Sequence, residues 1–243
     1  MQLSFFQKKL RSFIKRALPS FVNQSDTYIL QHLPESVKSI ARYRNIWTAG
    51  NKKNNDVDLI RLLFLSCMVE ELENIPGAFA ELGVYKGNSA KLLHTLAPER
   101  ELYLFDTFAG FDTGDVHTDP KLKIHKNHFL DTSLEAVKQF IQGSEKVHFC
   151  SGHFPATAKQ VPEKETFALV HLDADLYAPT LAGLQFFYPR LFHGGAMIIH
   201  DYFSGAWPGV KQAVDEFLKD KPEKIIRIPD KSGTGVFRTY MHP

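Results

Sequence analysis

Short apolar runs and helical patterns alternate along most of this chain. Seven runs have the length and composition of strands, over residues 78–82, 102–105, 147–150, 167–172, 196–199, 224–228 and 235–240. The spacing of apolar positions elsewhere predicts helices over 56–74, 88–96, 133–142, 176–191 and 210–219, the first of them capped by Asp56. Such alternation predicts an α/β fold with a doubly wound, mostly parallel, seven-stranded sheet.

The first 50 residues have a different pattern. Apolar residues recur there at helical spacing among lysines and arginines, at Phe6, Leu10, Phe13, Ile14 and Ala17, and Pro19 ends the run. One interpretation is a basic amphipathic helix in peripheral contact with an anionic membrane. The other is an arm that packs on its own domain or on a partner subunit in a homo-oligomer. A polar stretch over 48–55 follows, so we expect a helical extension over 1–50 and a catalytic domain over 51–243.

Composition narrows the class of protein. A hydrophobic content of 44% in 243 residues is enough for a sizeable core, and a net charge of +2 gives no global electrostatic case for nucleic acid. No run reaches the roughly 20 apolar residues of a membrane span, and no secretory signal is recognisable. Cys67 and Cys150 lack metal or redox spacing and are expected to be buried free thiols. These features are typical of a cytoplasmic enzyme.

Acidic residues follow two of the apolar runs directly. Asp173 and Asp175 come after the run at 167–172, and His200 and Asp201 come after the run at 196–199. Ligands of open parallel sheets bind at the carboxyl ends of strands, so these side chains are expected to meet at one edge. Three carboxylates and an imidazole are enough to hold a divalent cation and to leave one carboxylate as a base.

A glycine segment follows the first strand. Gly83 and Gly87 allow a tight turn and a close approach to the backbone, and Asp106, which ends the second strand, is placed to bind ribose hydroxyls. The glycine spacing is not the dinucleotide fingerprint. Together with the acidic Glu81, it favours S-adenosylmethionine over NAD, because the sulfonium is cationic and carries no pyrophosphate.

With these motifs in place, the chain resembles the macrocin O-methyltransferase (TylF-like) family of metal-dependent sugar methyltransferases over about residues 56–220. The resemblance rests on five motifs together, at 81–87, 104–111, 151–157, 172–177 and 200–202. It implies the class I S-adenosylmethionine methyltransferase (Rossmann-like) fold and a Mg²⁺-assisted O-methylation of a sugar hydroxyl.

The resemblance also implies roles for individual residues. Asp173 and Asp201 match the metal ligands, Asp175 matches the general base, Asp106 matches the ribose-binding acid, and Ser151-Gly152 would lie by the adenine. The full set of expected cofactor contacts is Glu81, Gly83, Val84, Tyr85, Gly87, Ser89, Asp106, Thr107, Phe108, Ser151, Gly152 and Asp173.

One position departs from the family pattern, because His200 stands where relatives usually carry an aspartate. If the imidazole is a third metal ligand, Mn²⁺ or another transition ion competes with Mg²⁺ for the site. The alternative is a histidine that hydrogen-bonds within the core. Asp175 also has alternatives, as a third metal ligand or as a helix cap.

The acceptor is left open between a glycoside, a polysaccharide and an antibiotic sugar. A phenol- or catechol-type O-methyltransferase and a non-catalytic cofactor-binding protein are the competing functions. The segment 111–130 has the composition of a substrate lid, with His125 and His128 as candidate substrate contacts. Trp207 and Tyr202 are candidates for stacking on a sugar ring, although core packing would explain them as well.

Overall fold

The computed structural model describes residues 58–117, 119 and 128–239, and the account below is restricted to them. The expected extension over 1–50, with its amphipathic pattern, lies outside the described residues, as do His125 and most of the remaining loop around it. The division of the chain into an extension and a catalytic domain therefore stays a prediction. Among the described residues, no helix has the length and apolar character needed to cross a membrane.

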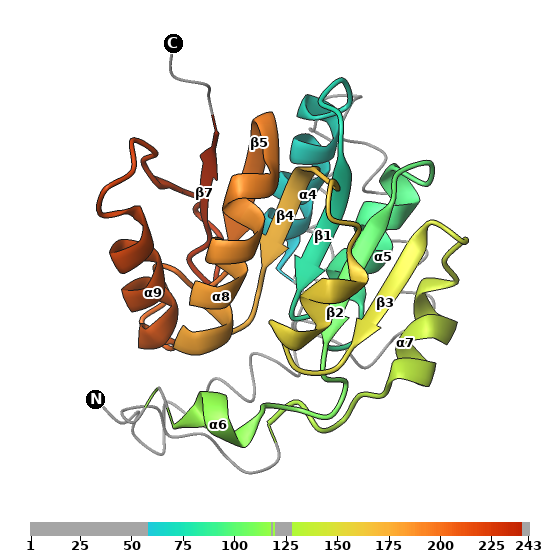
Figure 1. Cartoon of the computed structure of the whole chain (residues 1–243), viewed down its shortest axis with the longest axis horizontal. Coiled ribbons are helices and arrows are strands. Elements are labelled where there is room, and N and C mark those ends of the chain that lie inside the picture. Colours follow the sequence, from blue (N-terminus) through green and yellow to red (C-terminus); the bar gives the residue numbers. More distant parts are fainter. Residues whose placement is uncertain (1–57, 118, 120–127, 240–243) are drawn as a thin grey trace, which may run out of the picture. The chain divides into compact units, whose positions relative to one another are not determined.

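A seven-stranded sheet forms the middle layer, in the order β3-β2-β1-β4-β5-β7-β6 (Figure 1). Its strands are β1 (Ala78–Leu82), β2 (Leu102–Asp106), β3 (Val147–Ser151), β4 (Phe167–Leu172), β5 (Leu191–Ile199), β6 (Ile226–Arg227) and β7 (Gly235–Arg238). The first five are parallel, whereas β7 runs antiparallel to β5 and β6 antiparallel to β7. The strand order reverses between β1 and β4, which is where ligands of such sheets bind.

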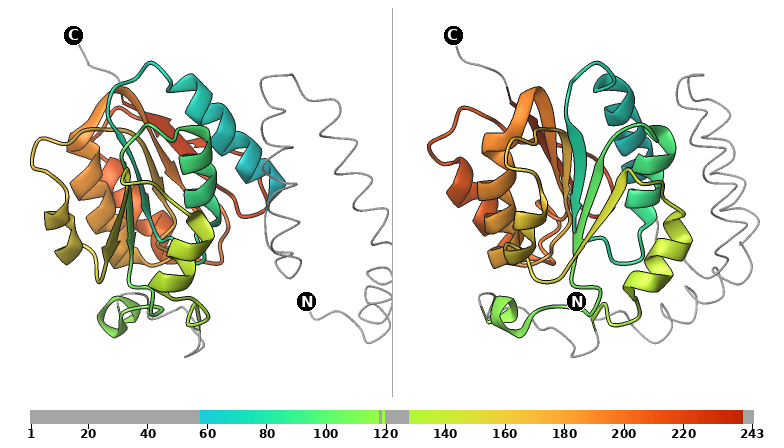
Figure 2. Two further views of the ribbon diagram at one scale, coloured as in Figure 1. Left: turned by 90° about the vertical axis from the view of Figure 1, so that its right-hand side faces the viewer. Right: turned by 45° about the vertical axis from the view of Figure 1, so that its right-hand side comes forward.

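Helices cover both faces of the sheet. One face carries α4 (Leu59–Glu71), α5 (Asn88–Leu96) and α7 (Leu134–Ile141), and the other carries α8 (Tyr177–Phe187) and α9 (Pro208–Leu218), as the right-hand view of Figure 2 shows. Short helical segments lie in the connections: α6 (Thr113–Val116), η2 (Ala156–Gln160) and η3 (Tyr188–Arg190). Covered on both sides, the central strands β1 and β4 are buried at every position, which explains why their sequences are apolar except at Glu81 and His171.

The predicted α/β architecture is confirmed, and most predicted elements lie within a residue or two of those observed. The prediction was wrong at four places. Asp58, not Asp56, caps α4 through its side chain. The helix expected to reach residue 191 ends at Phe187, because the following Pro189 has no N–H to continue it. Strand β5 begins five residues early, at Leu191, and β6 spans two residues only.

Candidate active site

The strands β1, β2, β4 and β5 end at one edge of the sheet, and each is followed by residues singled out in the sequence. The connection that carries α6 runs along this edge, at the bottom of Figure 1. Two groups of polar residues form here, one around Asp106 after β2 and one around Asp173 after β4.

Asp106 organises the first group through its carboxylate. Its Oδ2 accepts hydrogen bonds from the amides of Val84 and Tyr85, at 2.7 and 2.8 Å, and its Oδ1 accepts one from the amide of Phe108 at 2.7 Å. A carboxylate has about four acceptor sites, so three are occupied by main chain and one is left. Asp106 therefore holds the glycine segment in shape. Ribose binding by the same carboxylate stays a prediction.

The expected adenine-side residues lie next to this group. Ser151 pairs with Asp106 across β2 and β3, and the amide of Gly152 donates to the Asp106 carbonyl at 2.9 Å. The hydroxyl of Thr107 donates to the carbonyl of Gly110 at 2.5 Å and closes the turn after β2. The fold thus brings together the segments at 83–87, 106–108 and 151–152, which are far apart in sequence.

Gly83 joins the two groups. It has a left-handed φ of +91°, and a Cβ at this position would lie 2.0 Å from the carbonyl oxygen of Asp173. The amide of Asp173 also donates to the carbonyl of Leu82 at 2.8 Å. No residue with a side chain fits at position 83 without displacing the backbone of Asp173. In this structure, the glycine serves close packing of two loops as well as the turn.

The second group contains three side chains with possible metal-ligand atoms, Asp173, His200 and Asp201, all of which lie within 4.8 Å of one another. Nδ1 of His200 lies 2.7 Å from Oδ1 of Asp173 and 2.7 Å from Oδ2 of Asp201. Despite these distances, neither oxygen is aligned with a ring N–H, so Nδ1 has no well-directed hydrogen bond. Arg61, from α4, contacts the other carboxylate oxygen of Asp173, with Nη1 3.2 Å from Oδ2.

Charge and burial set the protonation of this group. Burial alone would raise the pKa of Asp173, but His200 and Arg61 outweigh it and hold that pKa well below its usual range. Burial opposes protonation of His200, but Asp173 and Asp201 raise its pKa to about 10. Burial, together with the negative charges of Asp173 and Asp201, raises the pKa of Asp175 well above its usual value. The protonated imidazole of His200 therefore places a positive charge between the two carboxylates.

Asp175 lies beside this group in a strained conformation. Both Asp175 and Asp201 have left-handed backbones, with φ of +61° and +60°. Strained non-glycine residues persist only where the surrounding structure holds them, and they concentrate at functional sites. The helix-cap alternative for Asp175 is wrong, since the N-cap of α8 is Leu176 and the amide of Tyr177 donates instead to Oδ2 of Asp119, at 2.6 Å.

Glu81 and Ser89 lie under this edge rather than on it. Glu81 is fully buried, and its Oε1 lies 2.8 Å from Nδ1 of His171 on β4 and also accepts a hydrogen bond from the Ser89 hydroxyl. His171 is fully buried too, and its ring lies 6.4 Å from the ring of His200. A role of Glu81 and Ser89 in cofactor binding stays a prediction, and in the structure their side chains bind each other.

Aromatic side chains gather at the same edge. Tyr85, Phe111, His128, Phe129 and Trp207 come from the loops after β1, β2 and β5, and their ring centroids lie 4.9–6.5 Å apart in successive pairs. All five are partly exposed. We call these five residues the aromatic cluster. Tyr202, by contrast, is largely buried and donates to Oδ1 of Asp215 at 2.6 Å, so it is not part of the cluster.

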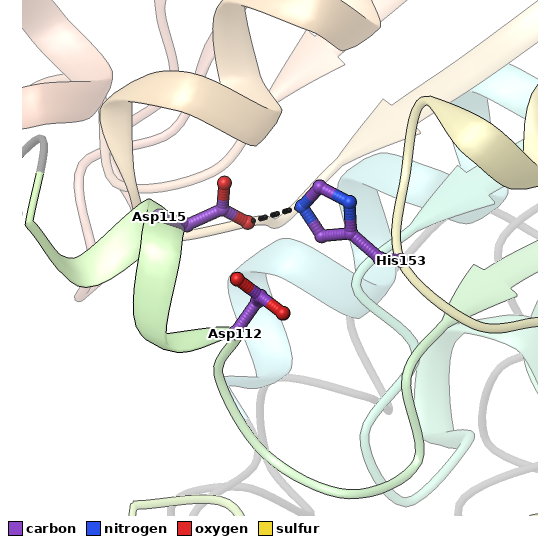
Figure 3. A group of neighbouring side chains, drawn as sticks. All are labelled: Asp112, Asp115 and His153. Carbon is purple, nitrogen blue, oxygen red and sulfur yellow. Dashed lines mark hydrogen bonds and ion pairs between the residues drawn. The ribbon is translucent and has the colours of Figure 1, made fainter.

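A further group of possible ligand atoms consists of Asp112, Asp115 and His153 (Figure 3). Each has a structural role already. Asp112 caps α6 by accepting from the amide of Gly114 at 2.7 Å, and Asp115 lies 2.9 Å from Nε2 of His153. This hydrogen bond joins α6 to the loop after β3. We therefore treat the group as a structural contact.

The chain matches the family model of the macrocin-O-methyltransferases (TylF) over residues 60–237, which includes both groups of polar residues. It belongs to that family. A demethyldecarbamoylnovobiocin O-methyltransferase of Streptomyces niveus is 32% identical over 181 residues, which cover 68% of each chain. An 8-demethyl-8-(2,3-dimethoxy-alpha-L-rhamnosyl)-tetracenomycin-C 4′-O-methyltransferase of Streptomyces olivaceus is 30% identical over 196 residues, which cover 74% of this chain and 73% of that one.

A solved structure has the same architecture. The O-methyltransferase NovP superposes with a TM-score of 0.64 at 26% identity, covering 75% of this chain and 81% of NovP. The fold is that of the class I S-adenosylmethionine methyltransferases, and the chain is an O-methyltransferase, as the sequence motifs indicated.

The sequence did not point to several residues at this edge. Arg61 occurs in the pattern of α4 as one basic residue among apolar ones and is not near any motif. His171 stands out only as a histidine inside an apolar run. Asp119 belongs to the segment expected to be a lid, but nothing in the sequence indicated that its carboxylate would be buried at the start of α8.

Proposed function

We propose that this protein transfers a methyl group from S-adenosylmethionine to a hydroxyl of a sugar, with a divalent cation held by Asp173, His200 and Asp201 and with Asp175 as the general base. The convergence of three ligand atoms beside Asp175 carries this proposal. It is supported by the two relatives above, whose names describe O-methylation of demethyldecarbamoylnovobiocin and of a rhamnosyl tetracenomycin.

The cofactor would bind between the glycine segment and the loops after β2 and β3. S-adenosylmethionine supplies the methyl group as a sulfonium. Asp106 accepts hydrogen bonds from the amides of Val84 and Tyr85 and so fixes the glycine segment. Its remaining acceptor site would bind a ribose hydroxyl. Ser151 and Gly152, held beside Asp106, would border the adenine.

The donor set of the second group fits a divalent cation. Nδ1 of His200 lies 2.7 Å from a carboxylate oxygen of both Asp173 and Asp201, and one N–H cannot donate a well-directed hydrogen bond to both. A cation bound between the three side chains would be coordinated by both carboxylates and by the imidazole. A divalent cation would supply Lewis acidity that lowers the pKa of an acceptor hydroxyl. The imidazole extends the range of suitable ions from Mg²⁺ to Mn²⁺ and other transition ions.

Asp175 would take the proton from the acceptor hydroxyl. Its pKa is raised by burial and by two neighbouring carboxylates, which makes it a stronger base than an exposed aspartate. The surrounding structure holds Asp175 in its left-handed conformation beside Asp173 and Asp201. Alignment of the hydroxyl with the methyl group would supply most of the remaining acceleration.

Two measurements test this proposal. Asp175→Asn keeps the shape of the side chain but removes the proton acceptor, so kcat should fall about a hundredfold or more while the calorimetric affinity for S-adenosylhomocysteine is unchanged. Exhaustive chelation should abolish methyl transfer from radiolabelled S-adenosylmethionine, and added Mg²⁺ or Mn²⁺ should restore it. Near-normal turnover of the Asp175 variant would show that Asp175 is not the general base. Full activity after chelation would show that the reaction needs no divalent cation.

A further inference from the structure

The aromatic cluster is larger than a sugar ring requires. One pyranose presents its C–H face to one aromatic ring, whereas four aromatic rings and an imidazole meet here from three separate loops. Phe129 and Trp207 are nearly parallel, with an interplanar angle of 29° and ring centroids 6.3 Å apart. Leu130, next in the chain, is also apolar and is 50% exposed.

Polar contacts hold the cluster in place from outside. The hydroxyl of Tyr85 donates to Oδ1 of Asp131 at 2.5 Å, Lys86 binds Oδ2 of the same carboxylate at 2.5 Å, and the hydroxyl of Thr132 donates to the Tyr85 carbonyl at 2.6 Å. Tyr85 and Phe129 both have left-handed backbones, with φ of +49° and +58°. The hydrogen bond between Asp115 and His153 in Figure 3 holds the other end of the connection that carries α6. The rings are therefore pre-organised.

The cluster is also in the right place to contact an acceptor. Tyr85 follows β1 in the segment held by Asp106, and Trp207 ends the loop that begins with His200 and Asp201. Because both loops start at the polar groups of the site, we infer that a group extending from a sugar bound at Asp175 meets this surface. Its aromatic composition favours a flat apolar group, because stacked and edge-to-face aromatic pairs are favourable beyond the apolar area that they bury.

We propose that the aromatic cluster binds the aglycone of the acceptor, and that the acceptor is a glycoside with a flat, apolar, aromatic aglycone rather than a polysaccharide. This inference rests on the proposed methylation of a sugar. It adds Phe129 and Trp207 as residues that determine specificity. A purely structural role, in which the rings only pack the connection after β2 onto its neighbours, is the competing explanation.

Fluorescence gives a test that does not require turnover. The chain has two tryptophans, so Trp47→Phe leaves Trp207 as the only reporter. Titration with p-nitrophenyl α-L-rhamnoside should quench Trp207 saturably, and methyl α-L-rhamnoside should bind at least about tenfold more weakly. N-acetyltryptophanamide corrects for absorption by the probe. An equal response to the two glycosides, or no response to either, would overturn the inference.

Kinetics with the same pair of glycosides separates a binding role from a structural one. Trp207→Ala and Phe129→Ala should each raise KM for the aryl glycoside about five- to tenfold and leave kcat and the KM for the methyl glycoside unchanged. Trp207→Phe should recover most of the loss. Phe192→Ala, which changes an exposed phenylalanine at the start of β5, is the matched control. Equal losses with both glycosides would assign the cluster a structural role.

The outcomes distinguish this inference from the proposed function. Equal methyl transfer to both glycosides would leave sugar methylation standing and overturn the aglycone surface. Saturable quenching of Trp207 by the aryl glycoside, without methyl transfer to any glycoside, would support the surface and contradict the proposed reaction.

Discussion

The contact between Gly83 and the main chain of Asp173 yields a prediction that links stability to the site. Replacing Gly83 by alanine adds a methyl group at a residue with φ of +91°, 2.0 Å from a carbonyl oxygen. Gly205 provides a matched control, because it also has a left-handed φ, of +69°, but nothing lies within 4 Å of its added Cβ. The two substitutions share the backbone strain and differ in the clash.

The expected magnitudes follow from these two contributions. A left-handed conformation costs a residue with a Cβ about 1–2 kcal/mol, which is all that Gly205→Ala should lose. Forcing an extra methyl group into a packed site adds about 1–3 kcal/mol, so Gly83→Ala should lose about 2–5 kcal/mol in total. The clash is with backbone, so rotation of a side chain cannot relieve it, and the loop after β4 must move.

Urea unfolding of the two variants measures the difference in the free energy of unfolding. Methyl transfer by Gly83→Ala, measured where the variant is folded, should also fall, because the displaced loop carries Asp173 and Asp175. Equal destabilisation by the two substitutions would show that the close approach contributes nothing. Loss of stability with unchanged turnover would show that the position of Asp173 does not matter for the reaction.

Three further predictions concern single side chains. Asp106→Asn places a side-chain N–H against at least one main-chain N–H and should lower the free energy of unfolding by about 2–3 kcal/mol. An unchanged urea midpoint would contradict the role of Asp106 as the acceptor that organises this loop. Burial raises the pKa of the Cys150 thiol to about 11. At pH 8, iodoacetamide should therefore label Cys67 first and Cys150 only in denaturant, and mass spectrometry measures the order of labelling. If the imidazole of His200 binds the cation, His200→Asp should shift the metal preference of methyl transfer from Mn²⁺ toward Mg²⁺, whereas identical metal series would exclude it as a ligand.

The central strands were predictable because buried strands consist mostly of apolar residues. Residues 78–82 and 167–172 are apolar almost throughout, and these are the two central strands covered on both faces. Strand β6 is short, lies at the edge of the sheet and has exposed residues, so its sequence carries a weaker apolar pattern. The strand predicted there was therefore too long.

The edge residues were predictable for a topological reason. Parallel strands end on the same side, so Asp106, Asp173 and Asp201 had to lie along one edge once the strands were recognised. Which of them would be neighbours depends on strand order. The placement of β4 beside β5, and of β1 beside β4, decides that Asp173 meets His200 and Gly83.

The sequence by itself determined the fold class, the edge of the sheet that carries the chemistry and the residue types available there, because all three follow from local periodicity and from chain direction. Only the tertiary structure decided how those side chains are used. The hydrogen bonds of Asp106 with the amides of Val84 and Tyr85, the contact of Arg61 with Asp173 and the burial of Glu81 against His171 join residues that lie 21 to 112 positions apart in the sequence. Such contacts leave no periodic signal in the chain, since each involves one pair of residues whose proximity is set by packing.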